Sequence, residues 1–291
     1  MLNKNENFGM NNLSNNYTLE AIKLLSKMSK DVKKKLLKAK ILKEDEDIAN
    51  LIPLLIESLQ SNKKGLDLFR KSNNSNDFLT KLWVSKVKEI ALKQLLITEN
   101  LKEFKGISKK DLSIISAYSS DTENYTKIKK ILLNEYGILL YFIHNIEGMK
   151  TDAVTFKLST GTPIIGMSLR FPQYDRFWFT LMHELSHICL HYDLLDEPII
   201  DNNYDAGDSI HDIANIENEA DDLARISLVS DKLWKKCRAR KKINDTLLLE
   251  FCNDNKLHPS IIAGFIKYEQ KKYYLYKNFN KNIVREKLLE N

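Results

Sequence analysis

Cysteine is scarce in this chain, with three in 291 residues, at Cys189, Cys237 and Cys252. A disulfide-stabilised fold needs more of them, and a cysteine-ligated zinc site needs pairs in Cys-x-x-Cys spacing. The wide separation of the three therefore excludes a disulfide scaffold and a zinc site built on cysteine.

Long apolar runs are also missing. No segment approaches the roughly 20 apolar residues that a membrane-spanning helix requires. The first residues are rich in asparagine and contain no apolar core of the kind found in secretory leaders. We therefore expect a cytoplasmic protein with no membrane partner.

Basic residues are absent from one stretch of the chain. Between Phe177 and Ala224 there is no lysine or arginine, but there are twelve acidic residues. Residues 151–224 carry a net charge of −11, whereas residues 1–150 carry +8 and residues 225–291 carry +9. The total of +6 thus hides an acidic middle that concentrates divalent cations.

Within the acidic stretch, His183–His187 has the pattern His-Glu-x-x-His. On a helix, residues four apart lie on one face, so His183 and His187 can bind one zinc ion from the same side. Glu184 would lie beside the open coordination position and act as general base. His191 continues the row, either as a partner of a ligand histidine or as a cap of the helix C-terminus.

The surroundings of the motif predict a partly buried helix. Phe177, Leu181, Leu185 and Ile188 form an apolar stripe at helical spacing, and Asp175 is the expected N-cap. The histidines lie beside this stripe. We therefore expect them to face a cleft rather than open solvent.

A second predicted helix, thirty residues past His187, supplies acids for a third metal ligand. Glu217 and Glu219 are two apart and point to different faces, so only one can reach the metal. We favour Glu217, because Asp221 then lies on the same face and can accept a hydrogen bond from a ligand histidine. The alternative is that these acids form a solvated helix face.

The residue pattern predicts an α+β fold, mostly helical, with a small sheet packed on the metal-binding helix of a zincin-like catalytic unit. We expect a disordered tail at 1–16, a helical N-terminal region at 17–136, and a zinc metallopeptidase domain with C-terminal helices at 137–291. Short β-branched or apolar runs predict strands at Ile138–Ile143, Ala153–Leu158 and Pro163–Leu169. The last strand either lies at the rim of the cleft, where a substrate strand can add to it, or is an ordinary buried strand.

Several segments together resemble one known family. They are Gly161–Arg170, Tyr174–His187, Leu190–His191, Glu217–Ala224 and, more weakly, His258–Gly264. The chain resembles the ImmA/IrrE family of zinc metallo-endopeptidases, above all the branch found beside or fused to HigA-type antitoxin regulators. The likeness covers about residues 62–275. It implies that Glu217, the first residue of a Glu-x-x-Ala-Asp pattern, is the third ligand.

Two departures from that family stand out. Phe265 follows the late glycine where the branch often has arginine, and the helix-turn-helix domain often fused upstream is not recognisable. The resemblance implies an endopeptidase that cleaves a protein regulator, a helix-turn-helix repressor or antitoxin encoded nearby, in a bacterial stress, phage-defence or toxin-antitoxin system. The alternatives are a toxin-like protease restrained by a partner, and a non-catalytic regulator or scaffold that retains a zinc fold.

Peptide hydrolysis also needs a donor that stabilises the oxyanion. Tyr174, Arg170, His211 and His258 are the candidates for oxyanion or substrate contacts, and the sequence does not rank them. Each is alternatively a packed or surface residue.

Six cations lie in the nine residues Trp234–Lys242, with Tyr273, Tyr274 and Tyr276 further on. Cations together with aromatic rings can bind single-stranded nucleic acid, and the family resemblance implies that such binding would be an activating signal. The competing interpretation is a solvated helix end.

Overall fold

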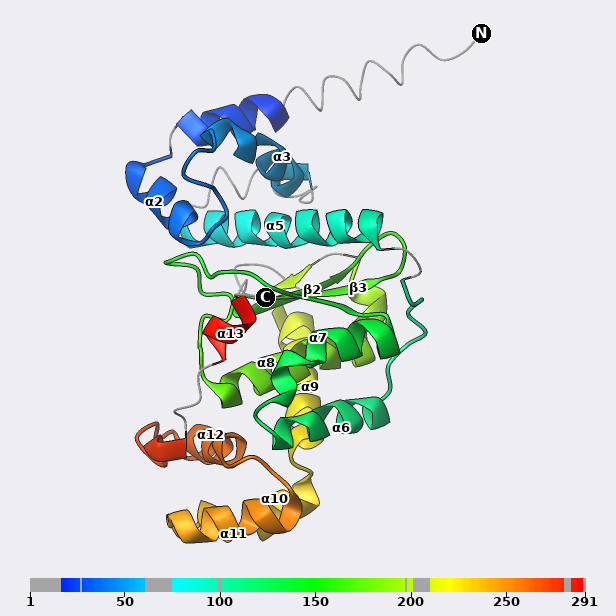
Figure 1. Ribbon diagram of the computed structural model, residues 1–291, viewed down its shortest axis with the longest axis vertical. Coiled ribbons are helices and arrows are strands. Elements are labelled where there is room, and N and C mark those ends of the chain that lie inside the picture. Colours follow the sequence, from blue (N-terminus) through cyan, green and yellow to red (C-terminus); the bar gives the residue numbers. More distant parts are fainter. Residues whose placement is uncertain are drawn as a thin grey trace. The chain divides into compact units, whose positions relative to one another are not determined.

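The computed structural model describes residues 17–26, 28–60, 75–98, 101–196, 198–200, 210–279 and 284–289. Its contacts divide the chain into two compact units, residues 1–97 with 143–150, and residues 98–142 with 151–291. Over the described ranges the protein is mostly helical with one small sheet, which is an α+β fold (Figure 1). The tail predicted at 1–16 lies outside these ranges.

The N-terminal unit is built from helices that pack their apolar stripes together. α3 and α5 pack against each other, and Leu51, Leu55 and Trp83 are almost fully buried. α2 begins after Ser29, whose hydroxyl accepts a hydrogen bond from the Val32 amide. The described helices of this unit are residues 17–26, α2 (Lys30–Lys38), a 3-10 turn (Ile48–Leu51), α3 (Ile52–Gln60) and α5 (Ser75–Ile97).

The second unit contains a four-stranded sheet of order β1-β3-β2-β4. β3 pairs in parallel with β1 and antiparallel with β2, and β2 pairs antiparallel with β4. The three predicted strands are confirmed; β4 is too short to show a periodic pattern. The strands are β1 (Leu139–Phe142), β2 (Ala153–Lys157), β3 (Pro163–Met167) and β4 (Ile199–Ile200). Since β3 lies between two strands and is buried throughout, it is the ordinary buried strand of the two alternatives.

Helices α7 and α8 pack against this sheet, and further helices complete the second unit. The sequence pattern assigns residues 98–136 to the helical N-terminal region, but in the structure they belong to this second unit. Leu112, Ile115 and Ile128 lie in its core. Helical periodicity shows that a stripe is buried but not which core buries it. The helices of this unit are α6 (Lys109–Ala117), α7 (Ile128–Ile131), a π-helix (Leu132–Tyr136), α8 (Tyr174–His191), α9 (Ile210–Leu228), α10 (Asp231–Lys236), α11 (Asp245–Asn255), α12 (Pro259–Gln270), α13 (Arg285–Leu289) and short 3-10 turns at Tyr118–Ser120, Asn124–Thr126, Tyr192–Leu194, Arg238–Arg240 and Lys277–Phe279.

α8 is the central helix of the unit, packed against β2 and β3 on one side and against α9 and α12 on others. Every residue from 181 to 188 is buried, so the helix is enclosed by neighbouring elements. Its N-cap is Gln173, with extended dihedrals, and not Asp175 as predicted. Pro172 disfavours helical geometry just before it, and the helix starts two residues later, which places Asp175 in the first turn, where the helix dipole favours an acid.

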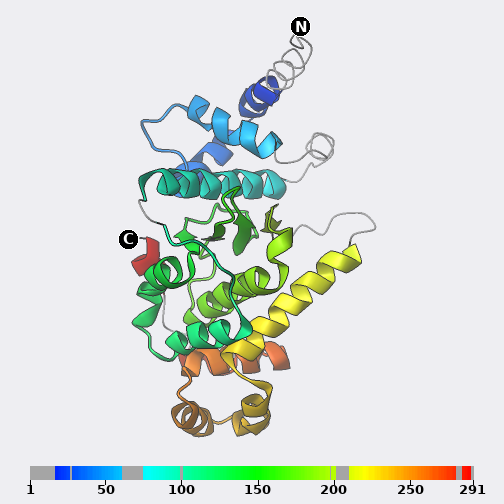
Figure 2. The same ribbon diagram turned by 90° about the vertical axis from the view of Figure 1, so that its right-hand side faces the viewer.

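α9 crosses α8 and gives this unit its closest helix pair (Figures 1 and 2). Ala220 and Ala224 are fully buried, and their small side chains let the two backbones approach. This crossing brings the acids of α9 to the histidines of α8. Over the residues that the structure describes, no helix combines the length and apolar character that a membrane span requires.

Candidate metal centre

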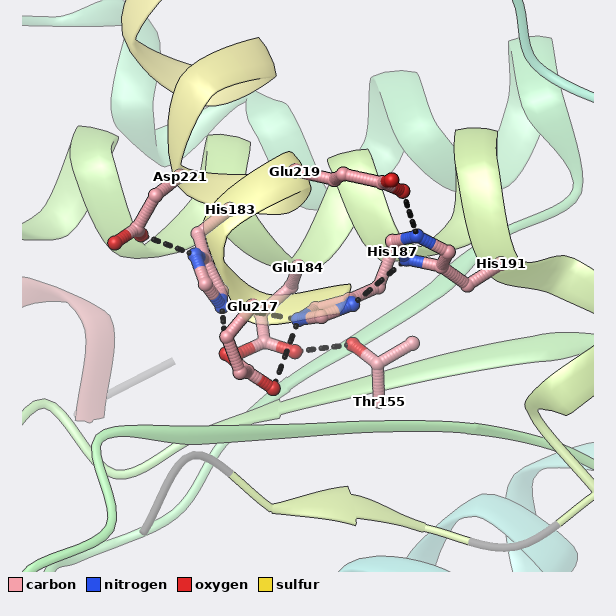
Figure 3. A network of polar contacts seen from close by, with 8 residues as sticks. All are labelled: Thr155, His183, Glu184, His187, His191, Glu217, Glu219 and Asp221. Carbon is pink, nitrogen blue, oxygen red and sulfur yellow. Dashed lines mark hydrogen bonds and ion pairs between the residues drawn. The ribbon is translucent and has the colours of Figure 1, made fainter. Parts of the chain in front are cut away.

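Two histidines of α8 and one glutamate of α9 form a buried cluster (Figure 3). His183 and His187 lie one turn apart, and their Nε2 atoms are 3.0 Å from each other. Oε2 of Glu217 lies 3.0 Å from Nε2 of His183, and Oε1 lies 3.5 Å from Nε2 of His187. The exposed fractions of the three residues are 6%, 1% and 8%, so the cluster is largely shielded from bulk solvent. The structure thus brings together the three residues that the sequence selected as ligands.

The donor atoms of this cluster fit a single divalent metal ion. All three lie within 4.8 Å of one another. Zinc bonds of about 2.0–2.1 Å at tetrahedral angles place ligand atoms about 3.3 Å apart, close to the separations found here. Oε1 of Glu217 is buried and has no hydrogen-bond partner within the described part of the chain. A cation would satisfy that oxygen and relieve the close approach of the two imidazole nitrogens.

The charge states of the ligands follow from burial and from their mutual contacts. Burial disfavours ionisation of Glu217, but its close contacts with His183 and His187 outweigh burial and lower its pKa to about 2. Burial also opposes a charge on His183, yet its contacts with Asp221 and Glu217 raise its pKa well above the usual value. For His187 burial dominates and lowers the pKa. Glu217 is therefore an anionic ligand at neutral pH, and His187 has a free electron pair for a metal.

Asp221 has the position predicted for it. Its Oδ1 lies 2.8 Å from Nδ1 of His183, on the ring side away from Glu217. Such a contact fixes the tautomer and the ring orientation of a ligand histidine. Two residues one turn apart on α9 thus supply one carboxylate to each ring nitrogen of His183.

His191 takes the first of the two roles left open for it. Its Nδ1 lies 3.2 Å from Nδ1 of His187, and its Nε2 lies 3.0 Å from Oε2 of Glu219. The His191 ring is 8% exposed, whereas the Glu219 side chain is 64% exposed. Glu219 therefore lies outside the triad of His183, His187 and Glu217, but it reaches the cluster through His191 (Figure 3).

Glu184 is held by a residue that the sequence did not indicate. Its Oε2 accepts a hydrogen bond of 2.5 Å from the hydroxyl of Thr155, a fully buried residue in the middle of β2. Glu184 itself is 2% exposed. A single threonine in a predicted strand has no spacing relationship to a helix further along the chain, so only the packing of α8 on β2 reveals this partner.

A cavity of about 840 Å³ opens onto the cluster. His183, Glu184 and Glu217 line it, so Glu184 and two of the three residues that could hold a metal face the same space. Phe179 of α8 and Phe265 of α12 form an aromatic part of the wall, with ring centroids 6.3 Å apart. Phe265, which stands where the family that the chain resembles often has arginine, thus forms part of the wall of this cavity.

Tyr174 lies in the core and the half-buried His258 packs against it, so neither lies at the cluster. The Tyr174 hydroxyl donates to the carbonyls of Ser119 and Asp121, and the residue is fully buried. It lies nine residues before His183, which at about 100° per residue is the opposite face of α8. The His258 ring packs 4.4 Å from the Tyr174 ring, and its Nδ1 caps α12 by accepting from the amide of Ser260.

The two other candidate donors have different positions. Nε of Arg170 donates to Asp152 at 2.7 Å, and its guanidinium packs over Phe171. Asp152 and Phe171 line the cavity, which places Arg170 behind its margin. His211 falls in the first turn of α9, and its side chain lies outside the described part of the protein. None of the described candidates reaches the triad through a hydrogen bond.

Part of the basic cluster at 234–242 takes part in internal contacts. The guanidinium of Arg240 pairs with Glu269 and lies 4.6 Å from the Trp234 ring centroid. These contacts connect the segment to α12. The nucleic-acid partner remains a prediction.

Comparison of the chain with protein-family models, with curated proteins and with solved structures found no match. The resemblance described from the sequence therefore stays a prediction. The geometry of the cluster and its cavity is therefore the basis for inferring the function of this protein.

Proposed function

We propose that this protein is a zinc-dependent endopeptidase that cleaves a protein regulator. The observation that carries the proposal is the position of Glu184. Its buried carboxylate adjoins two histidines and a glutamate arranged as metal ligands, and it opens onto the same cavity as His183 and Glu217. A metal site that serves only to hold a fold has no need of a fourth, non-ligating acid at its opening.

Two imidazoles and one carboxylate are a ligand set found in catalytic zinc sites, where the remaining coordination position stays open. His183, His187 and Glu217 would hold the ion, and Asp221 would orient His183. When bound, zinc supplies Lewis acidity to a peptide carbonyl and lowers the pKa of a water molecule.

Glu184 would then act as the general base and acid of the reaction. Its carboxylate accepts a proton from the attacking water and later delivers it to the nitrogen of the departing amine. Thr155 restrains this carboxylate through Oε2, which limits its rotation. A base held within reach of both proton positions needs no large side-chain movement between the two transfers.

The cavity supports a peptide substrate. Its volume of about 840 Å³ is at the upper end of the range for binding pockets and exceeds what a metal and its water require. The aromatic wall of Phe179 and Phe265 suits a large apolar side chain near the cleaved bond. The resemblance of residues 174–187 and 217–224 to the ImmA/IrrE family supports a regulatory protein, a repressor or an antitoxin, as the natural substrate.

The test is proteome-derived peptide cleavage followed by mass spectrometry of new termini. Purified protein is incubated with a peptide mixture, alone, with a chelator, and after readdition of one equivalent of zinc. Glu184→Gln is the matched control, because it keeps the shape of the site and removes the base. We expect cleavage that disappears with chelator, returns with zinc and falls about 10²–10⁴-fold in Glu184→Gln. Equal cleavage by Glu184→Gln and the wild type would overturn the proposal.

A further inference from the structure

The two histidines of the cluster are supported in different ways by the same helix. Asp221 of α9 contacts Nδ1 of His183 directly, at 2.8 Å. No described carboxylate contacts Nδ1 of His187; this atom faces Nδ1 of His191 at 3.2 Å. Glu219 of α9 then lies 3.0 Å from the far nitrogen of the His191 ring. The acids at 217, 219 and 221 thus serve one cluster from a single helix (Figure 3).

If the proposed metal site is correct, this chain of contacts permits one assignment of protons. Nε2 of His187 faces the other ligand atoms and must be unprotonated to bind a metal, which leaves its proton on Nδ1. That proton is donated to Nδ1 of His191, so His191 carries its own proton on Nε2. Nε2 in turn donates to the carboxylate of Glu219. Each ring nitrogen of His187 and His191 is then either a hydrogen-bond donor, a hydrogen-bond acceptor or a metal ligand, and the Glu219 carboxylate is an acceptor.

We infer that His191 is a positioning residue that connects the Glu219 carboxylate to the metal-binding nitrogen of His187. The inference rests on the proposed function, since it gives His187 the role of a ligand. Both ring nitrogens of His191 are engaged by side chains, and the ring is buried, so it holds His187 in one orientation. The negative charge of Glu219 polarises both rings and strengthens electron donation by His187.

Burial explains why the relay needs an intermediate ring. His187 is 1% exposed, and a carboxylate in direct contact with its Nδ1 would add a further buried charge to those of Glu217 and Glu184, at additional desolvation cost. The Glu219 side chain remains 64% exposed and hydrated, while His191 carries its influence inward. Through His191, the exposed acid Glu219 therefore acts on the buried histidine His187.

A double-mutant cycle on zinc affinity tests the relay, with dissociation constants measured by competition against a chromogenic chelator. Glu219→Gln keeps the side-chain shape and removes the charge. His191→Phe keeps a ring of similar size and removes both nitrogens. We expect each variant to weaken zinc binding about 10-fold or more, within the 10–100-fold range for partners of ligand histidines. In the His191→Phe background, Glu219→Gln should have no further effect, because the connection is already broken.

Asp222→Asn is the matched control, since it also removes one exposed carboxylate from α9 and its side chain is 76% exposed. It should leave the zinc dissociation constant within twofold of the wild type. Histidine ¹⁵N spectra of the zinc-loaded protein give an independent readout, with His191 expected in the Nε2-protonated form.

Three results would overturn the inference. Glu219→Gln could behave like Asp222→Asn, the effects of Glu219→Gln and His191→Phe could add, or His191 could carry its proton on Nδ1. In these cases zinc binding by the wild type would still leave the proposed function standing. Absence of zinc binding by the wild-type protein would instead remove the proposed function, and the relay with it.

Discussion

The hydroxyl of Thr155 donates a hydrogen bond of 2.5 Å to Oε2 of Glu184, and both residues are buried. The bond connects the middle of β2 to α8, two elements separated in sequence by β3 and the turn that follows it. It fixes the acid that the proposed mechanism requires against the sheet. A buried, charged acceptor gains more from such a bond than a neutral one.

Removing this hydroxyl should slow the chemical step without affecting metal binding. Thr155→Val keeps the size and the branching of the side chain, but it leaves the carboxylate less restrained. We expect kcat to fall about tenfold, equivalent to ~1.4 kcal/mol in the barrier, with KM and zinc content unchanged. Thr162→Val, at a buried threonine bonded to Thr160, is the control. Equal kcat values for the two variants would show that Thr155 has only a packing role.

Substitutions of the two acids Glu217 and Glu219 of α9 should differ in their effect on the zinc content of the protein. Glu217→Ala removes one of three proposed ligands, so we expect it to retain less than a tenth of an equivalent of zinc after gel filtration. Glu219→Ala should keep close to one equivalent, because it acts only through His191 and weakens binding without removing a ligand. Elemental analysis of both proteins, loaded with one equivalent of zinc, decides between them. Zinc retained by Glu217→Ala and lost by Glu219→Ala would reverse the ligand assignment.

Phe265 should contribute to substrate binding but not to chemistry. Its ring meets that of Phe179 in the cavity wall, so a charge there disfavours an apolar side chain of the substrate. We expect Phe265→Asp to raise KM about tenfold for a cleaved peptide, with kcat nearly unchanged. Leu249→Asp, at a 39% exposed leucine of α11, controls for the added charge. Identical KM values for the two variants would mean that the aromatic wall does not contact substrate.

The stability of the fold should decrease in alkali because of Cys252. Burial raises the pKa of this thiol to about 12, from an ordinary value of 9.0. The unfolded chain therefore loses this proton at lower pH than the folded one, and stability that is complete below pH 9 declines as the pH rises from 9 towards 12. The slope is about 1.4 kcal/mol per pH unit from this group. Urea unfolding between pH 7 and 10.5 should show a shallower decline for Cys252→Ala and parallel curves below pH 8; equal slopes in alkali would contradict the assignment.

The features that the sequence predicts correctly depend on residues that lie close together along the chain. His183, His187 and Glu184 lie within five residues, so helix geometry alone places them on adjoining positions. Glu217 and Asp221 follow the same rule on a second helix. The strands at 139–142, 153–157 and 163–167 were predicted because each is a short apolar run bounded by turn residues.

Contacts between distant segments could not be predicted in this way. Thr155 meets Glu184 only because α8 packs on β2, and Glu219 meets His191 only because α9 crosses α8 at one particular angle. Tyr174 and His258 have residue types suited to an oxyanion donor, but Tyr174 is bonded within the core and His258 packs against it and caps α12. The type of a residue indicates which chemistry its side chain could perform. Tertiary packing decides whether that side chain lies where it can perform it.

The central claim is that His183, His187 and Glu217 bind one zinc ion next to Glu184. Anomalous X-ray diffraction at the zinc absorption edge, on crystals of protein loaded with one equivalent of zinc, tests it most directly. We expect a single peak about 2.0–2.2 Å from Nε2 of His183, Nε2 of His187 and a carboxylate oxygen of Glu217. A peak at another location, or none at these three atoms, would contradict it.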